Sequence, residues 1–336
     1  MKISASIYSY RKEKGLEQLV KDLDADAIDM LHVDCADDDK AFDDIRRIRQ
    51  VSKTPIDLHI ISSEPEKYFS HIENLEIEFV SFQYENLKEF PVLPKGLNTK
   101  FGLSIVSSTP IDVFEQVEAS YDFVVMMSTT PGKSGGEFNR ESFQRIISFQ
   151  HRFPKKKIHA DGGVNDQIAY ILRMLGVNAV VSGSYLVNHE SLTSGMLSFH
   201  QPPKESHRNF QVQEFMTGTK YLPVLYEEHL DFKTILQAIE DYKLGFALIV
   251  NNDGKLSGVV SNADIRRGLL SSTSDFNAVN LKEVINRNPI AIREDTTVSG
   301  IVRLLNDLNF IVLFLPVVNE NGQLKGTVLL NNLIRV

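Results

Sequence analysis

Eight short apolar segments in roughly the first 200 residues alternate with segments that have one apolar face, and this alternation restricts the possible folds more than any other feature. Alternating strands and helices are typical of a parallel sheet. Continuous apolar strands indicate a sheet that is covered on both faces. Eight such units predict a (β/α)8 barrel (TIM barrel) of small size. The predicted strands are 3–8, 27–34, 56–61, 79–83, 101–106, 123–128, 157–161 and 179–182, and the predicted helices include 15–23, 40–51, 111–117, 140–152 and 166–175.

A different pattern begins after residue 199. Residues 200–210 contain Pro202, Pro203 and several charged side chains, and paired prolines oppose regular structure, so we expect a linker there. The remaining residues, 211–336, repeat an apolar segment, an Asp-Gly or Asn-Gly turn and a second apolar segment, which is a hairpin signal. We therefore predict a barrel at 1–199 and a smaller α+β domain of two similar modules at about 211–272 and 280–336. The apolar segment 310–316 is interpreted as a core strand or a buried dimer surface, with the core preferred.

The composition excludes several classes of function. A length of 336 residues favours two domains over one. The formal net charge of -8 argues against nucleic acid as a partner. No apolar segment is long enough to span a membrane, and residues 1–4 do not resemble a signal peptide. The single cysteine, Cys35, excludes an intrachain disulfide and suits the reducing cytoplasm, where we expect the protein to be located.

Four side chains at the ends of predicted strands are potential metal ligands. His32 and Asp34 are two residues apart, so they project from the same face of one strand. His59 and Asp161 end two other strands, and the carboxyl ends of barrel strands converge at one mouth. A single strand-end His or Asp is more often a cap or a surface group, but the convergence of four favours a site. Two imidazoles and two carboxylates suit one Zn²⁺, Fe²⁺, Mn²⁺ or Co²⁺ ion, and the two carboxylates could also transfer protons.

Glycines follow the predicted strands at which a barrel usually binds phosphate. Gly162 and Gly163 follow the seventh strand, and Gly183 with Ser184 follows the eighth. Backbone N–H groups in these two loops commonly hold a phosphate dianion. A third loop at 130–136, after the sixth strand, could close over a ligand. One Gly-Gly pair is usually only a turn, but glycines in the loops after both of these strands indicate a phosphorylated substrate.

These segments resemble, in order and spacing, the ribulose-phosphate 3-epimerase family over roughly the first 190 residues. The matching runs are 3–7, 31–34, 55–59, 127–132, 160–164 and 181–184. The resemblance implies a barrel of the ribulose-phosphate-binding type that inverts C3 of a ketose phosphate, with ribulose 5-phosphate and xylulose 5-phosphate as the family's pair. It implies that His32, Asp34, His59 and Asp161 hold one divalent metal ion and that Asp34 and Asp161 are the catalytic carboxylates, one on each side of an enediolate. It also implies that the substrate is contacted by Ser6, His59, Gly132, Lys133, Ser134, Gly135, Gly162, Gly163, Gly183 and Ser184.

The chain departs from the family pattern around the sugar. The family's run after His-x-Asp is replaced by 35–40, its His-Leu-Met is His59-Ile60-Ile61, and a lid aromatic is replaced by Lys133. The metal ligands and both carboxylates are retained, so we expect epimerisation of a ketose phosphate that is not specified further. One alternative is a catalytically inactive barrel that senses a sugar phosphate or nucleotide. A barrel decarboxylase is disfavoured because the chain has no Asp-x-Lys-x-x-Asp run at a strand end.

The duplicated region resembles a pair of cystathionine-β-synthase-type (CBS) modules. The resemblance rests on 258–265, where Ser261 and Asp264 match the positions that contact phosphate and ribose in this family. It implies an adenine nucleotide as a regulator. The second copy, 326–333, has neither the hydroxyl nor the carboxylate, so we expect at most one nucleotide site. The alternative is a module that only dimerises, and because such modules often pair between chains, we expect a homodimer or a higher homo-oligomer.

Overall fold

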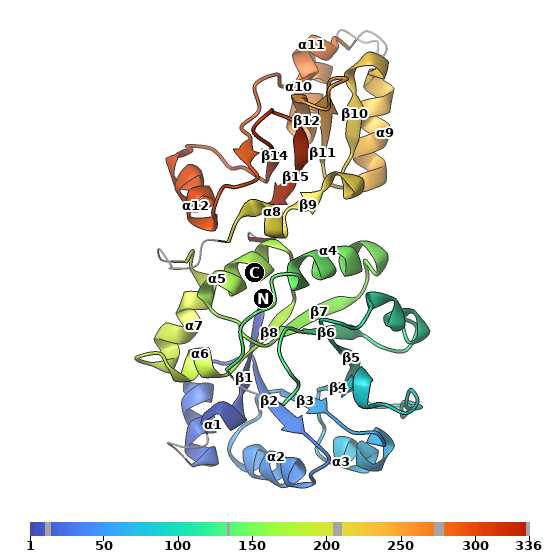
Figure 1. Ribbon diagram of the computed structural model, residues 1–336. Coiled ribbons are helices and arrows are strands. Elements are labelled where there is room, and N and C mark those ends of the chain that lie inside the picture. Colours follow the sequence, from blue (N-terminus) through green and yellow to red (C-terminus); the bar gives the residue numbers. More distant parts are fainter. Residues whose placement is uncertain (11–14, 133–134, 204–209, 272–278, 334–336) are drawn as a thin grey trace. The chain divides into compact units, whose positions relative to one another are not determined.

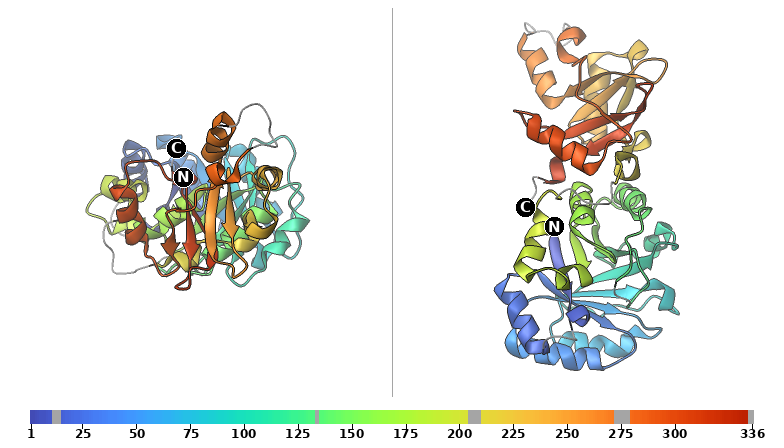
Figure 2. Two further views of the ribbon diagram at one scale, coloured as in Figure 1. Left: turned by 90° about the horizontal axis from the view of Figure 1, so that it is seen from above. Right: turned by 60° about the vertical axis from the view of Figure 1, so that its left-hand side comes forward.

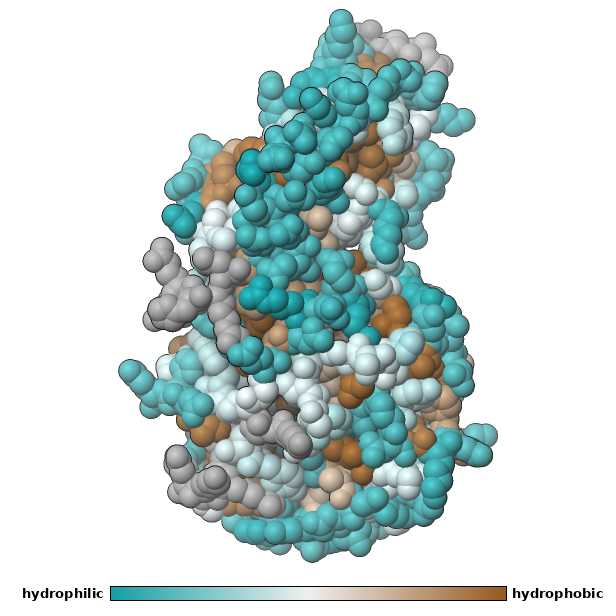
Figure 3. Space-filling model, viewed as in Figure 1, coloured by the Kyte–Doolittle hydropathy of each residue, from teal (hydrophilic) through white to brown (hydrophobic). Residues whose placement is uncertain are grey.

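The computed structural model of the chain describes residues 1–10, 15–132, 135–203, 210–271 and 279–333 (Figure 1). The chain divides into two compact units, residues 1–206 and 207–335. The predicted linker includes residues 204–209, which lie outside the described residues. Among the described helices, none combines the length and the apolar character needed to cross a membrane. The surface in Figure 3 is mostly hydrophilic, with separate hydrophobic patches on both units.

The first unit is a closed barrel of eight parallel strands, hydrogen-bonded in chain order, with β8 pairing back onto β1. The strands are β1 (Lys2–Ser6), β2 (Met30–Cys35), β3 (Ile56–Ile60), β4 (Phe79–Gln83), β5 (Lys100–Val106), β6 (Phe123–Met127), β7 (Lys157–Asp161) and β8 (Ala179–Ser182). Every residue of β3 and β6 is buried, as expected for strands covered on both faces. The helices lie around the outside of the strands (Figures 1 and 2). The predicted (β/α)8 barrel is confirmed.

Amphipathic helices cover the barrel. In α2, the buried residues Phe42, Ile45 and Ile48 recur every three positions and form one apolar face. The other helices of this unit are α1 (Leu16–Ala25), α3 (Phe69–Asn74), α4 (Ser142–Arg152), α5 (Asp166–Met174), α6 (Ser184–Val187) and α7 (Leu192–His200), and α2 itself is Lys40–Val51. These apolar faces pack against the strands and hold them in place. The polar side chains of the site project from the ends of these strands.

Three predicted elements of the barrel are wrong in part. The strand predicted at 27–34 is β2, which begins only at Met30. The first strand ends at Ser6, and Ile7–Tyr10 forms the 3-10 helix η1, so the apolar run continued past the strand into a turn. Residues 111–117 were predicted as an α-helix, but Ile111–Gln116 is the 3-10 helix η4, in which only Phe114 is buried. A segment this short, with β-branched residues and one buried side chain, gains little from the α-helical form.

His159 lies inside the barrel. Its ring stacks on Phe123, with ring centroids 4.4 Å apart, and Phe79 lies 6.1 Å away. Burial in this aromatic surrounding lowers the pKa of His159 from 6.5 to about 4, so the imidazole is neutral in the folded protein near pH 7. His159 and Asp161 are two residues apart on β7 and therefore project from the same strand face.

We predict that His159 makes the barrel sensitive to acid. Folding lowers its pKa, so below pH 6.5 the unfolded chain binds a proton that the folded protein does not bind until about pH 4. Lowering the pH through this window should therefore cost about 3 kcal/mol of the free energy of unfolding. Denaturant titrations at pH 7 and pH 4.5 should show a smaller pH effect in His159→Leu than in the wild type. An equal pH effect in both proteins would contradict the prediction.

The second unit consists of two small sheets built from duplicated elements. The order β10-β11-β12 in the first sheet corresponds to β13-β14-β15 in the second, where β9 adds a fourth strand. In each copy a parallel strand pair is followed by an antiparallel hairpin. The elements are α8 (Val212–Phe215), β9 (Thr217–Gly218), β10 (Val224–Tyr226), α9 (Phe232–Tyr242), β11 (Phe246–Val250), β12 (Leu256–Ser261), α10 (Asn262–Ser271), α11 (Leu281–Val284), β13 (Ile292–Arg293), α12 (Val298–Asp307), β14 (Phe314–Val318) and β15 (Leu324–Leu329).

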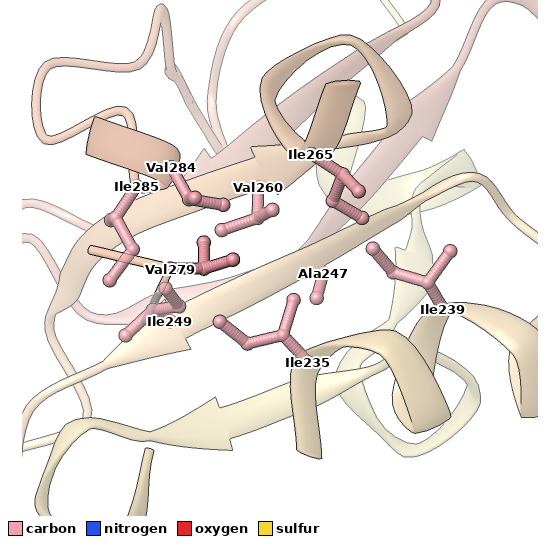
Figure 4. Close-up of a cluster of buried hydrophobic side chains, with 9 residues drawn as sticks. All are labelled: Ile235, Ile239, Ala247, Ile249, Val260, Ile265, Val279, Val284 and Ile285. Atoms are coloured by element: carbon pink, nitrogen blue, oxygen red, sulfur yellow. The ribbon is translucent and has the colours of Figure 1, made fainter. Parts of the chain in front are cut away.

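Each module has its own core, and the two modules join through their hairpins. Figure 4 shows the core of the first module, in which Ile235 and Ile239 of α9 pack toward Ala247 and Ile249 of β11. The hairpin turns exchange backbone hydrogen bonds, one from the Leu256 N–H to the Gly322 carbonyl and one from the Leu324 N–H to the Gly254 carbonyl, both 3.0 Å long. The rings of Phe246 and Phe314, the first residues of β11 and β14, stack with centroids 3.8 Å apart. The two modules therefore form one packed pair.

The preferred core assignment of 310–316 is wrong for its first part. The strand β14 begins only at Phe314, and Phe310, Ile311 and Leu313 are exposed by 57%, 82% and 49%. The core assignment was based on the hydrophobicity of the run alone, but these side chains border an open cavity of the module pair. An apolar run can line a binding surface as well as a core.

Candidate active site

A cavity of about 560 Å³ opens where the carboxyl ends of the barrel strands meet. His32 and Asp34 of β2 and Asp161 of β7 line it, together with the loops that follow β1, β6, β7 and β8. Of the predicted substrate contacts, those that line the cavity are Ser6, Gly132, Gly135, Gly163, Gly183 and Ser184. Lys133 and Ser134 lie outside the described residues. Gly162 stands between two lining residues, and His59 reaches the site through its hydrogen bond to Asp34.

His32, Asp34 and His59 come together below this cavity. One carboxylate oxygen of Asp34, Oδ1, lies 3.3 Å from His32 Nε2 and 3.2 Å from His59 Nδ1. Within the described part of the chain, these are the residues whose potential ligand atoms lie within 4.8 Å of one another. The structure thus brings three of the four predicted ligands together. Asp161 lines the same cavity but is outside this group of three.

In each histidine, the ring nitrogen that does not face Asp34, here called the outer nitrogen, has a buried hydrogen-bond partner. His32 Nδ1 lies 3.0 Å from Asp57 Oδ2, and the same oxygen accepts a 2.8 Å hydrogen bond from the Ser4 hydroxyl. His59 Nε2 lies 2.7 Å from Gln83 Oε1. Histidines that bind metals usually have such a partner on the second ring nitrogen. Asp57 and Gln83 were not among the predicted site residues, although Asp57 lies two residues before His59 on β3 and therefore shares its strand face.

The two carboxylates of the site have opposite pKa shifts. Burial raises the pKa of Asp34, but the charges and hydrogen bonds of His32 and His59 outweigh burial and hold that pKa well below its usual value. For Asp161, burial is the stronger influence and raises the pKa, helped by the negative charge of Asp34. Two acids with pKa values driven apart are suited to the roles of base and acid.

The glycines of the predicted phosphate loops are required by their surroundings. Gly162 and Gly163 have φ angles of +99° and +68°, which disfavour any side chain. A Cβ on Gly163 would lie 2.3 Å from the Phe138 backbone nitrogen, and one on Gly183 would lie 2.1 Å from Ser9 Oγ. The loop after β7 therefore packs closely against the loop after β6, and the loop after β8 packs closely against η1.

We predict that Gly163→Ala damages this loop. The Cβ would meet backbone at 2.3 Å and sit on a left-handed residue, so the free energy of unfolding should fall by about 2–4 kcal/mol. The matched control is Gly96→Ala, because Gly96 has a φ of +84° but nothing within 4 Å of an added Cβ. The control should lose about 1 kcal/mol. Equal losses in denaturant titrations of the two variants would show that the close approach at Gly163 is unimportant.

Another cavity, of about 700 Å³, lies in the second unit. Ser261, Asp264, Arg266 and Arg267 of the first module line it together with the second module's run from Phe310 to Phe314. Asp264 is buried, accepts hydrogen bonds from the Ser261 N–H (2.7 Å) and hydroxyl (2.5 Å), and forms an ion pair with Arg267. The two predicted nucleotide contacts are thus joined to each other at one cavity wall.

The closed barrel with polar groups converging at its mouth defines an enzyme of the (β/α)8 class. The family model of the "Ribulose-phosphate 3 epimerase family" matches residues 2–187, more than half of the sequence. The chain belongs to the ribulose-phosphate 3-epimerase family, so it is a carbohydrate epimerase, an enzyme of the isomerase class. The CBS domain model matches residues 212–271 and 281–336, which confirms the predicted tandem pair.

Known proteins similar to this chain cover its two parts separately. The ribulose-phosphate 3-epimerase of Bacillus subtilis is 26% identical over 198 residues, which are 55% of this chain and 91% of that protein. The chloroplastic ribulose-5-phosphate-3-epimerase of Arabidopsis thaliana is 29% identical over 198 residues, 54% of this chain and 70% of that protein. A solved structure of CBSX2 in complex with AMP covers 38% of this chain and 94% of its own, with 22% identity and a TM-score of 0.32.

Proposed function

We propose that the barrel epimerises a ketose phosphate at C3, using one divalent metal ion and two carboxylates. The observation that carries this proposal is the convergence of Asp34 and Asp161, with opposite pKa shifts, on one cavity bordered by glycine loops. Ribulose 5-phosphate and xylulose 5-phosphate are the first substrates to test, because the relatives named above are ribulose-phosphate 3-epimerases.

The residues present fit a divalent metal ion. His32 Nε2, His59 Nδ1 and an Asp34 oxygen are close enough to share one ion, and each histidine has a buried acceptor on its outer nitrogen. Asp161 would complete the set of two imidazoles and two carboxylates. Imidazole and carboxylate ligands suit Zn²⁺, Fe²⁺, Mn²⁺ or Co²⁺. When bound, the ion supplies positive charge for the oxygens of an enediolate, which makes C3 acidic enough to lose its proton.

The two carboxylates account for the proton transfers. Asp34, ionised because of His32 and His59, takes the C3 proton from one side of the substrate. Asp161, which lines the same cavity, gives a proton to C3 from the other side. The configuration at C3 is inverted, Asp34 is left protonated and Asp161 ionised, and the reverse reaction exchanges their roles. The phosphate, held by backbone N–H groups near Gly163 and Gly183, positions C3 between them.

Solvent deuterium exchange tests this function directly. The purified protein, supplied with Zn²⁺, Fe²⁺, Mn²⁺ or Co²⁺ in D₂O, is expected to incorporate deuterium at C3 of a pentulose phosphate while forming its epimer. The unphosphorylated pentulose is the control and should react much more slowly, since phosphate binding positions C3. If no ketose phosphate exchanges but one raises the melting temperature, the barrel is a sensor, and the epimerase proposal is wrong.

We also propose that the module pair binds an adenine nucleotide at the cavity with Ser261 and Asp264. A carboxylate accepts two ribose hydroxyls, and Arg266 at the same cavity suits phosphate. The exposed apolar run from Phe310 provides a surface for a base. The second copy has Leu329 in place of the first copy's hydroxyl and Asn332 in place of its carboxylate, so at most one nucleotide per chain is expected. The homodimer remains a prediction, to be tested by sedimentation velocity.

We predict that Asp264→Asn removes nucleotide binding. A nucleotide at 100 times its Kd should stabilise the wild type by about 2.7 kcal/mol, seen as a higher melting temperature of the second unit. The variant should lose most of this shift, because the amide has one acceptor oxygen in place of two, and its NH₂ group only donates. Asp241→Asn, on the exposed end of α9, is the matched control and should keep the shift. A flat titration of the wild type with AMP, ADP and ATP would leave association between chains as the role of the pair.

A further inference from the structure

The hydrogen bond from His59 to Gln83 continues through further side chains to the turn after β5. His59 Nε2 lies 2.7 Å from Gln83 Oε1, at the carboxyl end of β4. The amide nitrogen of Gln83 donates to Glu85 Oε2. The other oxygen of Glu85 accepts from the Val106 N–H at 3.0 Å and from the Thr109 hydroxyl. These hydrogen bonds thus link a predicted metal ligand to the turn after β5.

The end of this series of hydrogen bonds at Glu85 is fixed in position. Arg145 of α4 donates to the carbonyl oxygens of Val106, at 3.1 Å, and Thr109, at 2.7 Å, and so holds the turn that binds Glu85. Both Glu85 oxygens are therefore engaged as acceptors. A carboxylate has no hydrogen to donate, so it must face the NH₂ group of Gln83 and not its oxygen.

The position of Glu85 determines which group donates in each hydrogen bond between Glu85 and His59. With its NH₂ turned to Glu85, Gln83 presents its carbonyl oxygen to the ring, and a carbonyl oxygen only accepts. The proton of His59 is therefore on Nε2. The nitrogen left to bind a metal is Nδ1, the one that lies 3.2 Å from Asp34.

We propose that Gln83 and Glu85 are positioning residues that fix His59 as a metal ligand through Nδ1. The proposal rests on the proposed metal site. Gln83 is completely buried, so it holds the ring in place, whereas Glu85 lies at the surface and determines which way the Gln83 amide points. In Glu85→Gln the amide of Gln83 is free to turn over, which presents its NH₂ group to His59 and moves the ring proton to Nδ1. The nitrogen that faces Asp34 then has no free electron pair for a metal ion.

Metal affinity is the first test. Competition with a chromophoric chelator should show Zn²⁺ binding that is about 10- to 100-fold weaker in Gln83→Leu and in Glu85→Gln than in the wild type. The matched control is Ser104→Ala, because Ser104 pairs with Gln83 across β4 and β5, is equally buried and has a hydroxyl without a partner among the described residues. The control should bind Zn²⁺ like the wild type. Glu85→Gln keeps the size of a surface side chain, so it should fold even if Gln83→Leu does not.

The protonated nitrogen of His59 is the second test. In ¹H–¹⁵N spectra of the imidazole groups, with His59 assigned by its loss in His59→Gln, the wild type should carry a proton on Nε2 with and without Zn²⁺. The proton should move to Nδ1 in Glu85→Gln. If these hydrogen bonds only stabilise the fold, both variants should melt at a lower temperature but keep the Zn²⁺ affinity and the ring-proton position of the wild type. That result would refute the inference. A wild type that binds no metal yet keeps the Nε2 proton would instead refute the proposed metal site.

Discussion

Asp34→Asn and Asp161→Asn should each reduce the rate of C3 epimerisation by about 10²- to 10⁴-fold, which is the usual contribution of a general acid or base. Each variant removes the proton transfer on one side of the substrate. The remaining carboxylate can still act on the epimer whose C3 hydrogen faces it. We therefore expect Asp161→Asn to exchange deuterium into one pentulose phosphate epimer without inverting it, as long as the metal site stays filled. NMR spectroscopy of C3 in D₂O measures exchange and inversion separately.

The control for these variants is a carboxylate on the same barrel that is remote from the mouth. Asp122 precedes β6, at the amino end of the strands, and is half-buried. Asp122→Asn should keep both exchange and inversion. Phosphate affinity, measured with inorganic phosphate, should be similar in all three variants, because the glycine loops are unchanged. If either Asp34→Asn or Asp161→Asn epimerises at the wild-type rate, the two-carboxylate mechanism is wrong.

Removal of the metal ion is the second change with a large expected effect. Dialysis against a chelator should abolish epimerisation, and at 1,000 times its Kd a metal ion should restore about 4 kcal/mol of stability together with activity. The His32→Ala variant should recover neither at metal concentrations that suffice for the wild type, since it removes one of the two imidazole ligands and breaks up the group of three closely placed side chains. The control His229→Ala changes an exposed histidine of the second unit and should behave like the wild type. Full activity after complete metal removal would contradict the prediction.

The barrel could be predicted because its signal is long and repeated. Eight apolar strands and their intervening helices support one another, and errors such as the end of β1 at Ser6 do not disturb the pattern. The short segment Ile111–Gln116 shows the limit, because one buried residue, Phe114, provides too little periodicity to distinguish a 3-10 helix from an α-helix.

The site was predictable only as far as strand ends identify it. His32, Asp34 and Asp161 were found because carboxyl ends of barrel strands converge. Asp57 was missed because a polar residue within an apolar strand has no distinguishing local pattern until its partner is known. Gln83 does end a strand, but an amide is not one of the metal-ligand types that marked the other strand ends. The cavity contacts of Tyr185 and His189 depend on how α6 packs beside the mouth, which no spacing in the sequence reveals.

The reciprocal bonds between the hairpin turns have a mechanical consequence for the second unit. With the Leu256 N–H tied to Gly322 and the Leu324 N–H tied to Gly254, neither repeat can slide along the other without breaking both bonds. The first repeat contributes Ser261, Asp264 and two arginines to the 700 Å³ cavity, and the second contributes the apolar run from Phe310 to Phe314. The two repeats have thus diverged so that each supplies a different part of one cavity, and neither repeat forms that cavity alone.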